Sequence, residues 1–444
     1  MSRNKFIALL LLTVLVMTSV SSVFAQDDFT AALESITGEG IVCPEGEAEI
    51  TFASGAVGLE TEVNRALADF FQEACPNVTI TFSQNPESAT EILNLYLQLW
   101  EAQSPDVDVF QVDVIWPAII APHVVDMNEY VDEETISGIF ADMIAGQTVE
   151  GRLVAIPWFS DAAGLYYRTD LLEKYGVEVP TTWAELEEAA AIIQEGEVAE
   201  GNAEFAGYVW QGNDYEGLTC DAHEWVVSTT GDSFITADGA VNVTDPAFAA
   251  LLESAVSWVG GISPEGVTTY QEEESRNAFQ SGNAAFMRNW PYAFPLGNSA
   301  DSAVAGQFGW VPLPTGGVRS GACLGGWQVA VSAYSDNVEA SVEFAKFMTS
   351  FEVQRLRALV QGLLPSRPAV YEDPEVAANA LFAAAGPILG TAYPRPSVIT
   401  GDRYGEASAI FSGGIHKILT GEIGVADGLA ELEAALTDFM AAGE

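Results

Sequence analysis

Residues 48–112 decide the fold, because they hold three strand-like segments, AEITFA (48–53), VTITF (78–82) and VDVFQV (107–112). Between the first two, apolar residues from Val63 to Ala74 recur at helical spacing, and a second helix is predicted over Ser88–Gln103. Strands that alternate with helices in this way form a parallel sheet with helices on both faces. The sequence therefore predicts an α/β fold.

A second α/β region begins near residues 153–157. Thr182 and Glu185 have the spacing of a capping box, which predicts a helix to about Gln194. Further helices are predicted over 219–229, 246–259, 338–349 and 421–440, with strands over 308–313 and 328–331. Because no internal repeat or long linker separates the two regions, we expect two lobes, each a sheet flanked by helices, joined by short hinges.

The first 25 residues are typical of a secretory signal peptide. Arg3 and Lys5 precede the apolar run Phe6–Met17, and Ala25 is the expected cleavage point. That run is shorter than the roughly 20 residues that a membrane span requires. No cysteine follows the cleavage point, so we expect no lipid anchor. These features predict a secreted protein, located in the periplasm or outside the cell.

The composition excludes partners that carry many negative charges. The chain has 63 acidic and 16 basic residues, which gives a formal net charge of −47. Binding to nucleic acid or to anionic lipid depends on clustered lysine and arginine, so neither partner is expected. The three histidines are too far apart in the sequence to suggest a zinc site. We therefore expect no metal and no cofactor.

Four cysteines in an exported chain suggest two disulfides. Of the three possible pairings, we favour Cys43–Cys75 together with Cys220–Cys323. The alternative is that some of these residues are free buried thiols.

Aromatic residues beside charged residues or paired glycines indicate where a ligand would bind. Sugar sites combine aromatic faces, which stack on the apolar side of the ring, with carboxylate or guanidinium groups that bond pairs of hydroxyls. Both kinds of residue occur in QVDVIW (111–116), PWFSD (157–161), RNWPY (288–292), GGW (325–327) and PRP (394–396). Glu60 and Asp113 also follow predicted strands, where ligands of parallel sheets bind. The pattern predicts a sugar-binding site.

These segments resemble the extracellular solute-binding proteins of ABC sugar importers, most closely the trehalose/maltose-binding group. The matching segments, in the family's order, are SGAVGLE (54–60), FQVDVIW (110–116), the stretch from PWFSDAAGLYYRTDLLEKYG (157–176) to GYVWQGNDYEGLTCD (207–221), GNAAFMRNWPYA (282–293), LGGWQVAVSAYSDN (324–337) and PRP (394–396). The resemblance implies a two-lobed periplasmic-binding-protein (Venus-flytrap) fold that closes on a mono- or oligosaccharide. It also implies delivery of that sugar to the membrane permease subunits of an ABC importer.

The order of these segments predicts how the chain divides between the lobes. We expect a signal peptide over 1–25, followed by the first part of lobe 1 over 26–156 and the first part of lobe 2 over 157–326. The chain then returns to lobe 1 over 327–372 and ends with the helices of lobe 2 over 373–444. The protein is expected to be a monomer.

The resemblance also implies a role for each matching residue. Carboxylates accept sugar hydroxyls, aromatic rings stack on the sugar, glycines allow its close approach, and one guanidinium donates to it. The matching residues are Glu60, Asp113 and Asp161; Phe159, Trp290, Tyr292 and Trp327; Gly325 and Gly326; and Arg395. Phe159 stands where an aromatic residue with a hydroxyl is expected. The chain also lacks the arginine that the family can carry near Glu91–Ile92.

The alternative function is that of a secreted glycoside hydrolase. Such enzymes use two carboxylates held roughly 5–10 Å apart, an arrangement that Glu60, Asp113 and Asp161 could imitate. The sequence contains no Gly-x-Ser-x-Gly, Walker A or His-Glu-x-x-His motif. We therefore expect a binding protein that is not an enzyme.

Overall fold

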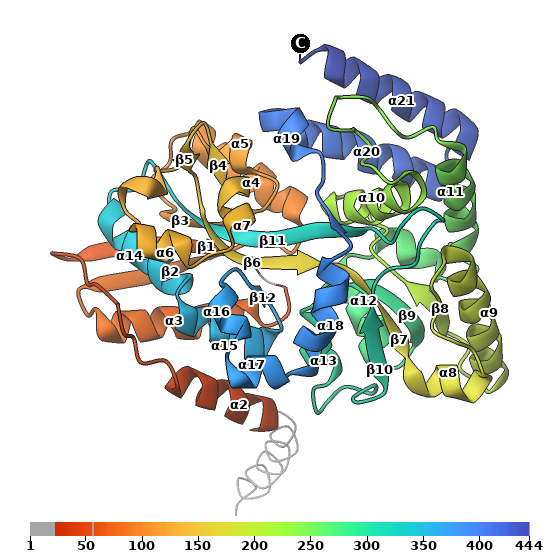
Figure 1. Cartoon of the computed structure of the whole chain (residues 1–444), viewed down its shortest axis with the longest axis horizontal. Coiled ribbons are helices and arrows are strands. Elements are labelled where there is room, and N and C mark those ends of the chain that lie inside the picture. Colours follow the sequence, from red (N-terminus) through yellow and green to blue (C-terminus); the bar gives the residue numbers. More distant parts are fainter. Residues whose placement is uncertain (1–22, 56, 444) are drawn as a thin grey trace, which may run out of the picture.

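The protein consists of two lobes that lie side by side (Figure 1). The computed structural model describes residues 23–55 and 57–443. Residues 1–22 of the predicted signal peptide lie outside this described part, so that peptide and its cleavage after Ala25 stay predictions. None of the helices in the described ranges combines the length and the apolar character that crossing a membrane requires.

The first lobe is built on a seven-stranded sheet. Its strands are β1 (Ala48–Ser54), β2 (Val78–Gln84), β3 (Val109–Asp113), β6 (Ile156–Ala162), β11 (Ala322–Val331), β12 (Leu364–Pro365) and β13 (Ala392–Tyr393). They lie in the order β12-β6-β11-β3-β1-β2, and β13 pairs with the end of β11. β1 pairs in parallel with both β2 and β3, as the alternation of strands and helices predicted.

The second lobe is built on a sheet with the order β10-β7-β9-β8. Its strands are β7 (Gly164–Arg168), β8 (Ala206–Val209), β9 (Ala284–Asn289) and β10 (Phe308–Val311). A separate two-stranded sheet pairs β4 (Thr148–Val149) with β5 (Arg152–Leu153). The prediction of a two-lobed α/β fold is confirmed.

Helices surround both sheets. The helices of the first lobe are α2 (Val23–Glu34), α3 (Glu60–Ala74), α4 (Ala89–Glu101), α5 (Pro117–Ile120), α6 (Glu133–Ser137), α7 (Ala141–Gly146), α14 (Val338–Met348) and α15 (Phe351–Gln361). Around the second sheet they are α8 (Thr169–Tyr175), α9 (Trp183–Ala199), α10 (Glu216–Thr230), α11 (Pro246–Trp258), α12 (Glu272–Gln280) and α13 (Ala293–Gly297). The last helices are α16 (Pro368–Tyr371), α17 (Pro374–Ala378), α18 (Ala380–Leu389), α19 (Ser397–Thr400), α20 (Tyr404–Leu419) and α21 (Val425–Ala441). The capping box that begins α9 is present as predicted.

Each lobe has its own hydrophobic core. Successive residues of β1 point to opposite faces of the first sheet, so Phe52 packs in one cluster with α3 and α14 while Ala53 packs in another with α4. The second lobe has one large cluster, to which the C-terminal helices contribute Phe411 and Leu436. Helices α20 and α21 therefore pack on the second lobe, whereas α16 and α17 pack against α15 (Figure 1).

Two strands, β6 and β11, run from one lobe to the other (Figure 1). β6 begins with Ile156 in the core of the first lobe and ends with Ala162 in the core of the second. β11 runs the opposite way, from Ala322 in the second core to Val329 in the first. Residues midway along these two strands therefore lie between the lobes.

The cysteines follow the prediction only in part. Cys43 and Cys75 form a disulfide with 5.3 Å between their Cα atoms. The predicted Cys220–Cys323 disulfide is wrong, because both residues are free and buried. The fold does bring the two thiols into contact, and burial raises the pKa of Cys220 well above its usual value. Since disulfide formation proceeds through the thiolate, burial disfavours the reactive form of Cys220.

Candidate functional site

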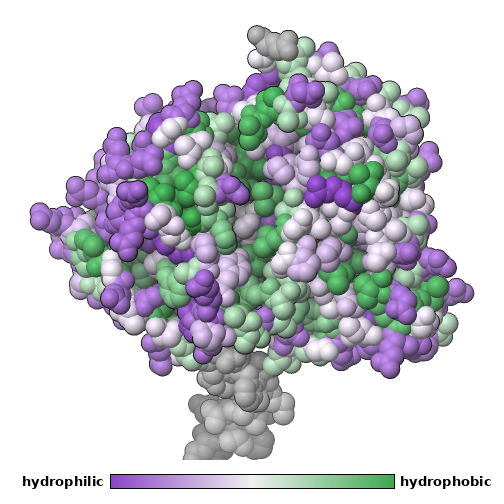
Figure 2. Space-filling view, in the orientation of Figure 1, coloured by the Kyte–Doolittle hydropathy of each residue, from purple (hydrophilic) through white to green (hydrophobic). Residues whose placement is uncertain are grey.

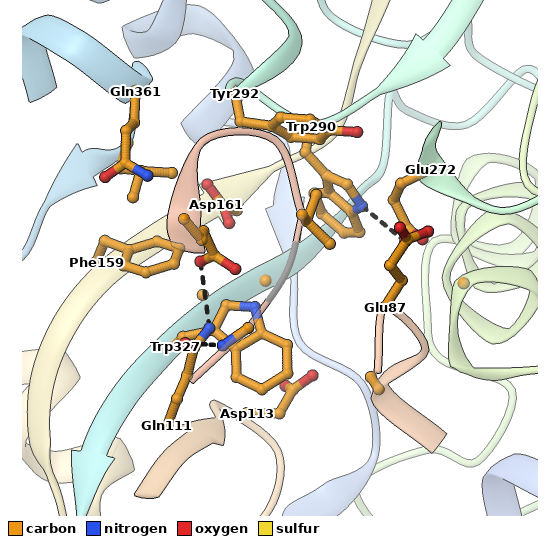
Figure 3. A pocket seen from close by; sticks show the side chains of 18 of the residues that line it. Glu87, Gln111, Asp113, Phe159, Asp161, Glu272, Trp290, Tyr292, Trp327 and Gln361 are labelled. Atoms are coloured by element: carbon orange, nitrogen blue, oxygen red, sulfur yellow. Dashed lines mark hydrogen bonds between the residues drawn. The ribbon is translucent and has the colours of Figure 1, made fainter. Parts of the chain in front are cut away.

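All ten residues that the sequence predicts as ligand contacts line one pocket between the lobes (Figure 3). They are Glu60, Asp113, Phe159, Asp161, Trp290, Tyr292, Gly325, Gly326, Trp327 and Arg395. The space among the residues that line it is about 960 Å³, a figure that includes open solvent. On the face seen in Figure 2, hydrophobic residues gather along the middle of the molecule, between more hydrophilic outer parts. Clefts between lobes are common positions for small-molecule sites.

The strand ends explain why the carboxylates of the first lobe meet. Asp113 is the last residue of β3, and Glu60 is the first residue of α3, shortly after β1. In parallel sheets the carboxyl ends of neighbouring strands share one edge, which is where ligands bind. On β6, Phe159 and Asp161 are two residues apart, and both line the pocket because alternate residues of a strand share a face.

The aromatic residues are held by specific partners. The ring of Trp327 meets that of Trp116 edge to face, with 5.7 Å between ring centroids and an interplanar angle of 88°. The indole Nε1 of Trp290 donates to Glu272 (3.4 Å). The hydroxyl of Tyr292 donates to Oε1 of Glu273 (2.7 Å). These contacts fix the rings around the pocket (Figure 3).

Gly325 and Gly326 of β11 lie very close to neighbouring groups of the pocket. A Cβ at Gly326 would lie 2.4 Å from the carbonyl oxygen of Phe159, and the φ of Gly326 is +128°. A Cβ at Gly325 would lie 3.0 Å from the ring of Trp290. A side chain at either position would therefore displace the walls of the pocket.

Arg395 bridges two buried carboxylates. Its Nη1 donates to Glu216 (2.7 Å) and its Nη2 to Asp113 (3.2 Å). Glu216 also accepts hydrogen bonds from the hydroxyls of Tyr404 (2.5 Å) and Ser408 (2.6 Å). Asp113 belongs to the first lobe and Glu216 to the second, so Arg395 ties the lobes together at the pocket.

The other two predicted carboxylates, Glu60 and Asp161, differ in their hydrogen bonds. Glu60 accepts a hydrogen bond from Nε2 of Gln111 (3.2 Å), whose Oε1 in turn accepts from the backbone N–H of Gly55 (2.8 Å). Asp161 is only 8% exposed, and its Oδ1 has no hydrogen-bond partner in the described part of the chain. A buried acceptor without a partner is costly, so Oδ1 marks a place where a ligand hydroxyl could donate.

Burial dominates the ionisation of these carboxylates. It raises the pKa of Asp113 to about 6, although the charge of Arg395 opposes the shift. Burial also raises the pKa of Glu60. The pKa of Asp161 is raised well above its usual value by burial and then by the charges of Glu60 and Asp113. The three side chains therefore hold protons more readily in the folded protein than in the unfolded chain.

Stability is expected to increase as the pH falls from 7 to 5. The pKa of Asp113 is higher in the folded protein than in the unfolded chain. Between about pH 4 and pH 6 the folded protein therefore binds more protons than the unfolded chain does, and lowering the pH favours folding. The raised pKa values of Glu60 and Asp161 act in the same direction. Thermal unfolding at pH 5 and pH 7 measures the effect. In 0.5 M salt, which screens surface repulsion, the rise should persist; a lower Tm at pH 5 would contradict it.

Several lining residues were missed in the sequence. They are Glu87, Gln111, Tyr215, Glu216, Glu272 and Gln361. Gln111 could have been found, because it lies two residues before Asp113 on a strand and therefore shares its face. Glu272 begins a run of three glutamates, a pattern that usually marks a solvated helix end. Trp158, which precedes Phe159 in the segment PWFSD, is fully buried in the first lobe and does not line the pocket.

The described residues, 23–55 and 57–443, contain no group of three or more His, Cys, Asp or Glu side chains that could hold a metal ion. Four acidic residues of the pocket are hydrogen-bonded to Gln111, Arg395, Tyr215 or Trp290; they are Glu60, Asp113, Glu216 and Glu272. The arrangement is suited to accept hydrogen bonds from an uncharged ligand with many hydroxyls.

Comparisons with known proteins agree with this description. Residues 56–355 match the family model "Bacterial extracellular solute-binding protein". A "Probable ABC transporter-binding protein" of Deinococcus radiodurans is 39% identical over 390 residues, which are 87% of this chain and 92% of the relative.

Solved structures show the same likeness. Maltose-bound T. maritima MalE3 is 38% identical with a TM-score of 0.83, and the match covers 88% of this chain and 99% of that chain. The GacH receptor of Streptomyces glaucescens, solved unliganded and with acarbose, is 26% identical with a TM-score of 0.78 over 89% and 99% of the two chains. The family model spans most of both lobes, and the Deinococcus relative covers nearly the whole chain. The protein therefore belongs to the family of bacterial extracellular solute-binding proteins.

Proposed function

We propose that the protein binds a mono- or oligosaccharide, of the trehalose or maltose kind, in the pocket between its lobes. It then delivers the sugar to the membrane permease subunits of an ABC importer. One observation carries the proposal: the pocket combines aromatic rings with buried carboxylates from both lobes, and one carboxylate oxygen, Oδ1 of Asp161, has no partner among the described residues. Sugars offer both the apolar ring face and the donor hydroxyls that such a pocket can bind.

The relatives support this ligand class. The T. maritima protein was solved with maltose and the GacH receptor with acarbose, and the Deinococcus relative bears the name of an ABC transporter-binding protein. In the proposed complex, Trp290, Tyr292 and Trp327 stack on the sugar. Glu60, Asp113 and Asp161 accept its hydroxyls.

The proposal includes the organisation expected from the sequence. The protein is exported by the signal peptide over 1–25 and acts as a monomer in the periplasm or outside the cell. The lobes divide at 26–156, 157–326, 327–372 and 373–444. Core packing supports this division, because α14 packs with the first lobe and α20 and α21 with the second.

A thermal-shift screen over maltose, trehalose, glucose and longer glucans tests the function. A sugar at 100 times its Kd stabilises the protein by about 2.7 kcal/mol, which gives a readily measured rise in Tm. Incubation with the same sugars and with nitrophenyl glycosides tests the alternative. Binding without product supports a binding protein, whereas release of nitrophenol would establish a glycoside hydrolase.

Sugar binding is expected to make the protein more compact. Asp113 lies on the first lobe and Trp290 on the second, so a sugar that contacts both binds the closed form more tightly than the open form. Small-angle scattering with and without the sugar measures the change in radius of gyration. Asp161→Ala should reduce both affinity and compaction, because it removes an acceptor that the sugar would satisfy. A tightly bound sugar that leaves the radius unchanged would indicate a static site instead.

A further inference from the structure

Arg357 has no role in the site as described so far, although it lies directly behind the pocket. It belongs to α15, is 2% exposed, and stacks on Trp158 with its guanidinium carbon 3.5 Å from the ring centroid. The same carbon lies 5.2 Å from the ring centroid of Phe159, which lines the pocket. The side chain is therefore held by cation–π contacts with two aromatic rings.

The guanidinium uses few of its hydrogen-bond donors. Nη1 donates to Oδ1 of Asn64 (3.3 Å), while Nε and Nη2 have no hydrogen-bond partner among the described residues. Nη2 lies 3.7 Å from Oε1 of Glu60, which is an ion pair without a hydrogen bond. Arg357 is a buried cation positioned mainly by packing, and Glu60 is its nearest anion.

The charge of Arg357 acts on both buried carboxylates at this end of the pocket. It opposes the effect of burial on the pKa of Glu60 and on that of Asp161. The pKa of Arg357 is itself lowered by burial to about 9, so the group stays charged at neutral pH. The other groups that face Glu60 and Asp161 are Gln111, Asp113, Glu273, Tyr96, Tyr166 and Tyr371. None of these six supplies a positive charge.

We propose that Arg357 is a positioning residue of the site: it touches no sugar, and its charge, 3.7 Å from Oε1 of Glu60, keeps Glu60 able to accept hydroxyl hydrogen bonds. A carboxylate accepts on both oxygens, whereas a protonated carboxyl must turn one oxygen into a donor. Removing this cation favours protonation of Glu60, and the pocket then loses an acceptor that the sugar needs. This inference rests on the proposed sugar-binding function and assigns a role to a residue outside the lining of the pocket.

The test compares the pH dependence of maltose affinity in the wild type, Arg357→Met and Arg357→Lys. An opposite charge within about 4–6 Å lowers a carboxyl pKa by roughly one to three units. As the pH is lowered, the Met variant should therefore lose affinity at a pH that is about one to three units higher than in the wild type. Its affinity should approach that of the wild type as the pH rises further. The Lys variant, which keeps the charge, should restore most of the wild-type profile.

A matched control is Arg367→Met. Arg367 is a partly buried arginine that donates to the carbonyl of Thr349 (2.8 Å) and does not line the pocket, so its loss should leave the pH profile of binding unchanged. A uniform loss of affinity at every pH in Arg357→Met would show a structural role only and would overturn the proposal. A wild type that binds none of the sugars in the panel would instead contradict the proposed function.

A second measurement covers the case in which Arg357→Met does not fold. The infrared difference spectrum between the maltose-bound wild type and maltose-bound Glu60→Gln at pH 7 reports the state of the Glu60 carboxyl. Loss of an ionised carboxylate band in the variant supports the proposal. Loss of a protonated carboxyl band would show that Arg357 does not keep Glu60 charged and would overturn it.

Discussion

Arg395→Met is expected to lower the free energy of unfolding by about 3–5 kcal/mol, because it leaves two buried carboxylates without their cation. The guanidinium of Arg395 is bonded to Asp113 and to Glu216, and the side chains of all three residues are at most 10% exposed. Methionine fills a similar volume but donates no hydrogen bond. Chemical denaturation of the ligand-free protein, monitored by circular dichroism, measures the loss.

Two further variants make this result specific. Lys346→Met removes a cation from a partly exposed pair with Glu343 and should cost no more than about 1 kcal/mol. Combining Arg395→Met with Asp113→Asn removes one of the two carboxylates that have lost their cation, and it should recover part of the lost stability. If Arg395→Met unfolds at the same denaturant concentration as the wild type, the bridge between the lobes does not contribute to stability.

Trp327→Ala is expected to weaken sugar binding by about 2–4 kcal/mol, roughly a 30- to 1,000-fold rise in Kd. The indole lies at the crossing of β11 between the lobes and lines the pocket, so its ring offers the sugar a broad apolar face. Alanine removes that face and leaves the ring of Trp116 without its partner. Calorimetric titration of the folded variant with the sugar found in the screen measures the loss.

The controls separate stacking from folding. Trp327→Phe keeps an aromatic face and should lose less affinity than Trp327→Ala. Trp183→Phe changes a buried tryptophan of α9 that does not line the pocket, and its affinity should equal that of the wild type. Unchanged affinity in a folded Trp327→Ala protein would remove Trp327 from the proposed site.

The elements with strong periodicity were predicted well. The strands and helices between Ala48 and Asp113 form as expected, because alternating β-branched residues and helical apolar spacing are local properties. Only the last residues of β11 were predicted as a strand, over 328–331, whereas the strand begins at Ala322. Its first five residues contain two glycines, which are depleted in strands, so pairing with β6 imposes the strand conformation there.

The ten site residues were recognised from segments of sequence, and the structure places all of them in one pocket. Their contacts with a sugar stay a prediction. Arg357 and Glu216 were not recognised, because nothing in their own neighbourhoods distinguishes them from ordinary helix residues. Their positions beside Glu60 and Arg395 arise from packing between segments that are more than 150 residues apart.

By itself, the sequence determined the class of fold, the order of its elements and the kind of chemistry in the pocket. These follow from periodicity, from residue type and from motifs that are contiguous in the chain. Only the tertiary structure decided which charges meet: that Arg395 bridges Asp113 and Glu216, that Arg357 stands behind Glu60, and that Cys220 and Cys323 touch as free thiols. The physical reason is that burial and charge pairing depend on distances between remote segments, and the folded chain alone sets those distances.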